Sequence, residues 1–201
     1  SNLTFQGHIN NLCKKAGQKL NALARISSFM NMEKRRVIMK SFIVSQFGYC
    51  PLIWMFHSRS LNNKINFLHE RALRITYDDK NLTFEELLKK HKSVSIHHRN
   101  LQILAIEMFK VYNHDAPSIL NDIFIRRTPV YNLRDDRYFE SRKVRSVYHG
   151  TESLSFLGSK IWDLVPCELK RAESLDIFKA KIKQFTFSEC PCRLCKTFVP
   201  N

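Results

Sequence analysis

The sequence predicts a mainly α-helical protein, in which a three-helix bundle precedes a helical subdomain with a short strand or loop region and a cysteine knuckle. Three observations predict this class. Apolar residues recur at helical spacing along most of the chain. The 201 residues include five Gly and six Pro, which are too few for a turn-rich sandwich or barrel. Hydrophobic residues make up 44% of the chain, which is enough to bury a core.

Two helices are expected before residue 48. The first spans residues 8–25. Its apolar face consists of Ile9, Leu12, Ala16, Leu20 and Leu23. The second begins after an N-cap at Asn31 and ends near Phe47, because Gly48 and Pro51 interrupt it.

The third predicted helix spans residues 61–77 and is capped near Ser60. The most apolar segment of the chain, residues 49–56, precedes it and is expected to be buried in a core. Because short turns connect the three helices, residues 1–78 are expected to form a bundle. A change in composition at residues 78–81 marks a predicted domain boundary.

The next part, residues 79–185, is predicted to be a helical domain. Thr83 and Glu86 have the spacing of a capping box. The predicted helices of this part span residues 84–91, 95–113, 116–124, 154–164 and 175–185. Residues 126–150 lack a helical period, and residues 143–148 alternate as a short strand does, so a loop or ribbon is expected there.

The charge of the chain predicts a polyanionic partner. Lys and Arg number 33 against 18 Asp and Glu, which gives a net charge of +15. Such an excess favours nucleic acid first and an anionic membrane second. No stretch approaches the ~20 apolar residues of a membrane span, and no secretory signal opens the chain. We therefore expect RNA and DNA as partners, no membrane, and a reducing nuclear or cytoplasmic location. Since the chain begins at Ser1, we also expect it to be part of a longer protein.

A cysteine-rich knuckle or tail is predicted over residues 186–201. Cys190, Cys192 and Cys195 combine C-x-C and C-x-x-C spacing, which suits a structural Zn²⁺. A structural site takes four ligands, and the fourth stays unassigned. The options are His149, Cys167, His91 or a residue beyond Asn201. The alternative is a set of exposed thiols near a frayed end. The other three cysteines (Cys13, Cys50 and Cys167) have apolar neighbours and are expected to be buried.

Basic side chains on the three predicted bundle helices suit the backbone of a nucleic acid. The candidate contacts are Lys14, Lys15, Lys19, Arg25, Lys34, Arg35, Arg36, Lys64, Arg71 and Arg74. Such contacts add salt dependence rather than sequence choice. For any single lysine, the alternative is an ordinary solvated helix face.

No catalytic residues are predicted. Asp78 and Asp79 invite comparison with the metal-binding aspartates of polymerases, but they stand at a helix end beside a lysine. No H-E-x-x-H, G-x-S-x-G, Gly-rich phosphate loop or kinase signature occurs. His97 and His98 stand at a predicted helix start, where they are interpreted as a polar first turn rather than as phosphate ligands.

Six segments form an ordered set of motifs along the chain: residues 46–59 (QFGYCPLIWMFHSR), 65–74 (INFLHERALR), 131–134 (YNLR), 158–162 (GSKIW), 178–179 (FK) and 190–196 (CPCRLCK). Together they resemble one family, the reverse transcriptases of LINE-type (non-LTR, jockey-like) retrotransposons. The resemblance covers nearly the whole chain. It is to the region that follows the catalytic palm.

The resemblance implies a fold and a role. Residues 1–78 would be the polymerase thumb, and the rest would be the C-terminal domain that ends in a zinc knuckle. The parent would be an RNA-directed DNA polymerase, with this fragment gripping the primer–template duplex and template RNA or target DNA beside palm and fingers domains. The catalytic aspartates are absent from this chain, so Mg²⁺ would belong to the missing palm and the isolated chain would bind without polymerising.

Two other classes of function remain open at this point. A decayed or host-adopted copy would act as a protein-interaction domain, through apolar residues of segment 49–56 left uncovered without the palm. A metal-dependent enzyme in its own right would require activity that depends on Asp78 and Asp79, and none is expected.

Overall fold

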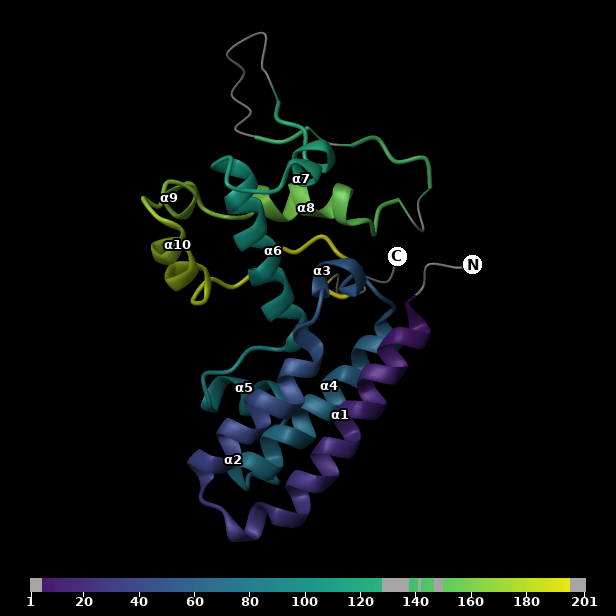
Figure 1. Cartoon of the computed structure of the whole chain (residues 1–201), viewed down its shortest axis with the longest axis vertical. Coiled ribbons are helices and arrows are strands. Elements are labelled where there is room, and N and C mark those ends of the chain that lie inside the picture. The colour runs from purple at the N-terminus through teal and green to yellow at the C-terminus, as the bar shows by residue number, and fades with distance from the viewer. Residues whose placement is uncertain (1–4, 128–137, 141, 147–149, 196–201) are drawn as a thin grey trace. The chain divides into compact units, whose positions relative to one another are not determined.

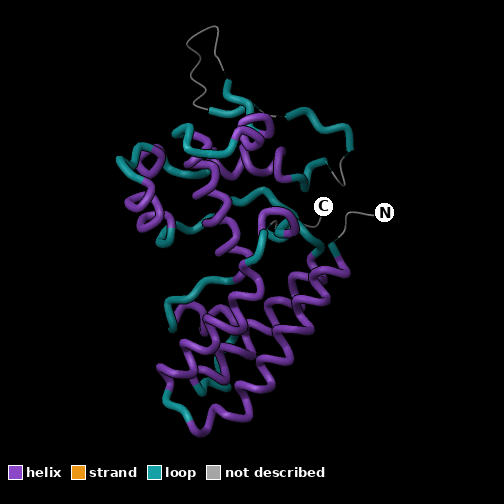
Figure 2. The backbone as a smooth tube through the Cα atoms, viewed as in Figure 1, coloured by secondary structure: helices purple, strands orange, loops and turns teal. Residues whose placement is uncertain are grey.

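The structure is a computed structural model that describes residues 5–127, 138–140, 142–146 and 150–195. Over these residues it contains ten α-helices and no strand (Figures 1 and 2). The predicted helical class is confirmed. The chain divides into two compact units, residues 1–100 and 101–201, and each is described by itself.

The first unit is built on two long helices, α1 (Gln6–Ile26) and α4 (Arg59–Tyr77), which pack against each other. Four of the five predicted apolar positions on α1 are buried, namely Ile9, Ala16, Leu20 and Leu23. The hydrophobic core joins them to Ile65, Ala72 and Leu73 of α4. The short turn η1 (Ser27–Phe29) follows α1.

The second predicted helix changes its winding along its length. α2 (Met32–Ile38) begins as predicted, since the Asn31 side chain accepts a hydrogen bond from the Lys34 N–H at 3.0 Å. It continues as a π-helical turn, η2 (Met39–Ile43), and then as a 3-10 helix, η3 (Val44–Gly48). The predicted break at Gly48 follows.

The apolar segment 49–56 is buried only in part. It forms the short helix α3 (Pro51–Trp54), with Trp54 and Met55 buried. Tyr49 and Ile53 are instead 73% and 61% exposed. A one-turn helix has one inward face, so apolar residues on its other side face solvent and full burial was a wrong expectation.

Helix α4 begins behind Ser58, whose side chain accepts from the Leu61 N–H, rather than behind Ser60. The predicted capping box of α5 (Phe84–Lys90) is present, with both Thr83 and Glu86 making their bonds. Leu87 of α5 is fully buried in the core that α1 and α4 form. The division after Asn100 therefore lies beyond the composition change at residue 78.

Helix α6 (Ile96–Tyr112) continues without interruption into the second unit. This unit also contains α7 (Ser118–Ile123), α8 (Leu154–Asp163), α9 (Cys167–Lys170) and α10 (Leu175–Ile182). Aromatic side chains fill its interior, where Trp162 lies against Phe139 and Phe178. The four-residue helix α9 was not predicted.

The expected short strand is not seen over described residues 143–146; residues 147 and 148 lie outside the described part. One isolated bridge pairs Arg126 with Phe139. None of the helices over the described residues combines the length and the hydrophobicity that a membrane-spanning segment requires.

Candidate functional site

Four side chains with metal-binding atoms meet in the structure: His97, Cys190, Cys192 and Cys195. Their ligand atoms all lie within 4.8 Å of one another. In a tetrahedral zinc site with Zn–S bonds of ~2.3 Å, ligand atoms lie roughly 3.5–4 Å apart. His97, Cys190 and Cys192 are buried, and Cys195 is half-buried. Three thiols and one imidazole form a donor set of structural zinc sites, so this cluster can hold a zinc-like ion.

Helix α6 presents His97 in its first turn. The Ser95 hydroxyl caps this turn by accepting from the His98 N–H at 3.1 Å. Farther along α6, Gln102 donates to the Lys183 carbonyl at 3.1 Å. Phe109 stacks on Phe178 with ring centroids 4.2 Å apart. These contacts hold the segment that leads to the cysteines along α6.

The segment that carries the three cysteines, residues 190–195, contains a tight turn. The Cys195 N–H donates to the Cys192 carbonyl at 3.1 Å. Between these two cysteines, the Arg193 N–H donates to the Glu152 carboxylate at 3.4 Å, and the Arg193 guanidinium lies 3.8 Å from the same carboxylate. Glu152 thus fixes the loop between two of the ligands.

Crowding of the thiols changes their acidity. Hydrogen bonding to Cys192, together with burial, raises the pKa of Cys190 to about 12. Hydrogen bonding to Cys190 and Cys192, with burial, also raises the pKa of Cys195 far above its ordinary value. Neighbouring thiols resist ionisation because their negative charges would repel each other in a buried place. A bound cation reverses this balance, since metal ligation takes the thiolate form.

The structure brings the three predicted cysteines together and adds a residue that was interpreted otherwise. His97 joins them, whereas His91 stacks on Tyr77 and Cys167 is exposed at the start of α9. His149 lies outside the described residues. A ligand 93 residues before Cys190 leaves no local spacing to find; the one sequence signal was an imidazole in the first turn of a largely apolar helix.

The expectation that the scattered cysteines are buried is wrong. Cys50 and Cys167 are exposed, and Cys13 is half-buried. Cys50 adopts a left-handed backbone before Pro51, which places it at a surface turn despite its apolar neighbours.

The predicted basic residues fall into two groups. Five are exposed and form no ion pair with any described residue: Lys14, Lys15, Arg25, Lys34 and Arg71. The others have protein contacts. Lys19 lies over the Phe42 ring, Lys64 donates to Asn10 at 3.1 Å, and Arg36 pairs with Glu33 at 2.9 Å.

Arg35 and Arg74 make hydrogen bonds within the protein. Arg35 donates to the Ile75 carbonyl at 3.0 Å. Arg74 pairs with Glu70 at 2.6 Å and donates to the carbonyls of the turn that follows α4, including that of Leu82 at 2.7 Å. Their guanidinium groups are engaged in holding one helix to its neighbours.

The two aspartates after α4 have structural contacts as well. Asp78 is the left-handed C-cap of α4. Asp79 pairs with Lys90 at 2.6 Å, and this contact holds the pKa of its carboxyl below the ordinary value.

Comparison with known proteins adds no relative. No family model, no curated protein and no solved structure matches this chain.

Proposed function

We propose that this chain binds nucleic acid through its first unit, without catalysing a reaction itself. The observation that carries the proposal is a charge imbalance. Residues 1–77 contain twelve Lys and Arg and two acidic residues, Glu33 and Glu70. Both acidic residues are already paired with a neighbouring arginine on their own helix. A face of this kind attracts phosphates along a strand.

The contact surface proposed is the joint edge of α1 and α4, here called the α1–α4 edge. Lys64 of α4 reaches Asn10 of α1, and Leu68 packs 3.8 Å from the position that a Cβ would take on Gly17. Lys14 follows Asn10 by one turn and Arg71 follows Lys64 by two turns, so helical spacing places both along this edge.

An aromatic residue stands among these bases. Phe67 is 64% exposed and follows Lys64 by three residues. Exposed rings beside basic side chains offer stacking surfaces to bases as well as charge to phosphates. Both features serve binding that is tolerant of sequence.

Within a longer protein, the proposed role is that of the thumb and C-terminal region of a LINE-type reverse transcriptase. The motifs over residues 46–59, 65–74 and 190–196 support it through their resemblance to that family. Duplex of primer and template would then lie along the α1–α4 edge. A structural Zn²⁺ in the Cys₃His cluster would hold the C-terminal segment in place.

The test is binding of the full chain to a labelled RNA–DNA primer–template duplex, followed by fluorescence anisotropy at several salt concentrations. The double variant Lys14→Gln, Arg71→Gln should bind more weakly and lower the slope of log affinity against log salt by about 2. The control variant Lys181→Gln, Lys183→Gln removes the same charge from α10 and the turn after it and should keep the wild-type slope. Equal losses in both variants would contradict a specific edge, and absence of binding at low salt would contradict the function.

A protein-interaction role has one observation in its favour, the exposure of Tyr49 and Ile53. Size-exclusion chromatography with light scattering separates the two functions. A tight homodimer without affinity for the duplex would favour this second function over the first.

A further inference from the structure

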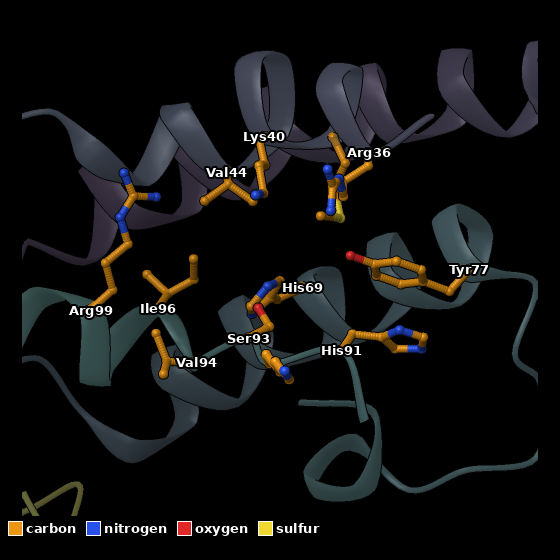
Figure 3. A pocket seen from close by; sticks show the side chains of 12 residues that line it. Arg36, Lys40, Val44, His69, Tyr77, His91, Ser93, Val94, Ile96 and Arg99 are labelled. Carbon is orange, nitrogen blue, oxygen red and sulfur yellow. The ribbon is translucent and has the colours of Figure 1, made fainter. Parts of the chain in front are cut away.

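A cavity of about 530 Å³ lies in the first unit, and neither Lys14, Lys64 nor Arg71 lines it (Figure 3). Its wall comes from α2, η2, η3, α4, the turn after α5 and the first turn of α6. Pockets of about 300–1,000 Å³ are of the size that holds small organic ligands.

The wall of the cavity is strongly basic. Four cationic side chains line it: Arg36, Lys40, Lys92 and Arg99. None of the described residues in the wall is acidic; Glu33, which pairs with Arg36, lies outside it. Like charges gathered in a recess favour an anion, because field lines concentrate where protein displaces water.

A buried histidine also lines this recess. His69 of α4 is 3% exposed, and its ring lies among the lining side chains in Figure 3. Its Nδ1 is buried and has no hydrogen-bond partner among the described residues. Burial, with a smaller contribution from Arg99, lowers the pKa of His69 to about 4, so the ring is neutral. A ligand that bonds this ring would satisfy a buried polar atom.

Backbone irregularities position two of the cations. Lys40 stands on the π-helical turn η2, a feature often found at functional sites. Lys92 has a φ of 47° and occupies the C′ position after α5, where the Ser93 N–H bonds the Leu88 carbonyl at 2.8 Å. Glycine is the residue that suits this conformation, so the lysine is held in a strained backbone.

The remaining wall is apolar and aromatic. Val44, Val94 and Ile96 line it, and Tyr77 turns its hydroxyl toward the cavity in Figure 3. Tyr77 is held by stacking on His91, with ring centroids 3.6 Å apart. A ligand that fits this wall carries an anionic group and a flat, weakly polar group.

We propose that this cavity binds a nucleotide, with the phosphate among Arg36, Lys40, Lys92 and Arg99 and the base against the apolar wall. The nucleotide is a free nucleoside monophosphate or the 5′-phosphorylated end of a strand. The strand-end form deepens the proposed function and rests on it, whereas the free form does not.

The test uses the full chain and two probes. Titration with 5′-AMP, followed by calorimetry and by the NMR signals of the His69 ring, measures the free nucleotide. Anisotropy of a short single strand with a 5′-phosphate, against the same strand with a 5′-hydroxyl, measures the strand end. The variants are Lys92→Gly and Lys40→Gln. The matched control is Lys89→Gln, which removes an exposed charge three residues from Lys92 and outside the cavity.

We expect 5′-AMP to shift the His69 signals and both variants to weaken its binding about tenfold, while Lys89→Gln binds as the wild type does. Lys92→Gly should also keep or raise the melting temperature, because glycine relieves the left-handed backbone. Loss of binding in a protein at least as stable would exclude misfolding as its cause.

The strand probes then identify the source. If the 5′-phosphorylated strand binds more tightly than the 5′-hydroxyl strand and this difference is lost in Lys92→Gly, the ligand is the strand end. If 5′-AMP binds but the two strands bind equally, the ligand is the free nucleotide. If Lys92→Gly changes the affinity for neither probe, or if Lys89→Gln weakens binding as much as Lys92→Gly does, the inference is overturned. Binding of the primer–template duplex by Lys92→Gly at wild-type affinity would separate the cavity from the α1–α4 edge.

Discussion

The buried imidazole of His69 makes the stability of the first unit sensitive to pH. His69 is 3% exposed, and its ring packs edge-on against Phe84 with centroids 5.6 Å apart. Because burial disfavours the charged ring, its pKa falls to about 4 from the ordinary 6.5. The unfolded chain therefore takes up a proton near pH 6.5, whereas the folded chain does so near pH 4.

The sign of the effect follows from this difference. His69 leaves stability unaffected above pH 6.5 and lowers the free energy of unfolding as pH falls from 6.5 to 4, by up to about 3 kcal/mol. Urea denaturation across this range, in chelator so that metal release does not contribute, measures it. His69→Gln should flatten the slope, whereas His8→Gln, at an exposed site, should retain it. An unchanged slope in His69→Gln would show that other groups control this range.

At the scale of helices, two arginines three residues apart on α4 have different tasks. Arg71 is exposed and forms no ion pair with a described residue, whereas Arg74 bonds Glu70 and the carbonyls of the turn toward α5. Arg74 thus fixes how the chain leaves α4 and approaches the capping box at Thr83.

Arg74→Gln should lower the free energy of unfolding by about 1.5–3 kcal/mol, since it removes charge-assisted hydrogen bonds from a half-buried place. Arg71→Gln should change it by less than ~0.5 kcal/mol and act on duplex binding instead. Circular dichroism during urea denaturation measures both. Equal stability of the two variants would mean that the turn is held without Arg74.

At the scale of the whole molecule, a metal in the Cys₃His cluster would join residues that lie 93 positions apart in the chain. Such a link restricts the unfolded chain and adds binding free energy to folding. With free metal at 100 times its dissociation constant, the addition is about 2.7 kcal/mol.

We expect the purified chain to carry one equivalent of zinc by elemental analysis, and a chelator to lower its melting temperature. Cys192→Ser should lose the metal and become insensitive to chelator. Cys50→Ser, which removes an exposed thiol outside the cluster, should behave as the wild type does. Full metal content in Cys192→Ser would contradict the cluster as the site.

Local signals in the sequence were sufficient for most helices. Asn31 and Thr83 cap the helices that they were expected to cap, because a cap bonds an amide two or three residues away. Local signals failed where packing decides. The exposure of Tyr49 and Ile53 depends on which face of a one-turn helix turns inward. Residues 143–146 do not form the predicted strand, because a strand requires a partner strand that local sequence does not specify.

From the sequence alone follow the helical class, the positions of most helices, the basic character of the first 77 residues and the three clustered thiols. These properties follow from composition and from spacing within a few residues. Packing brought His97 to the three thiols in a cluster that can hold a metal, made Arg74 a structural contact while Arg71 stays exposed, and placed Lys40, Lys92, Arg99 and His69 in the wall of one cavity. Each of these depends on chain segments that meet only after packing, and no local spacing encodes such a meeting.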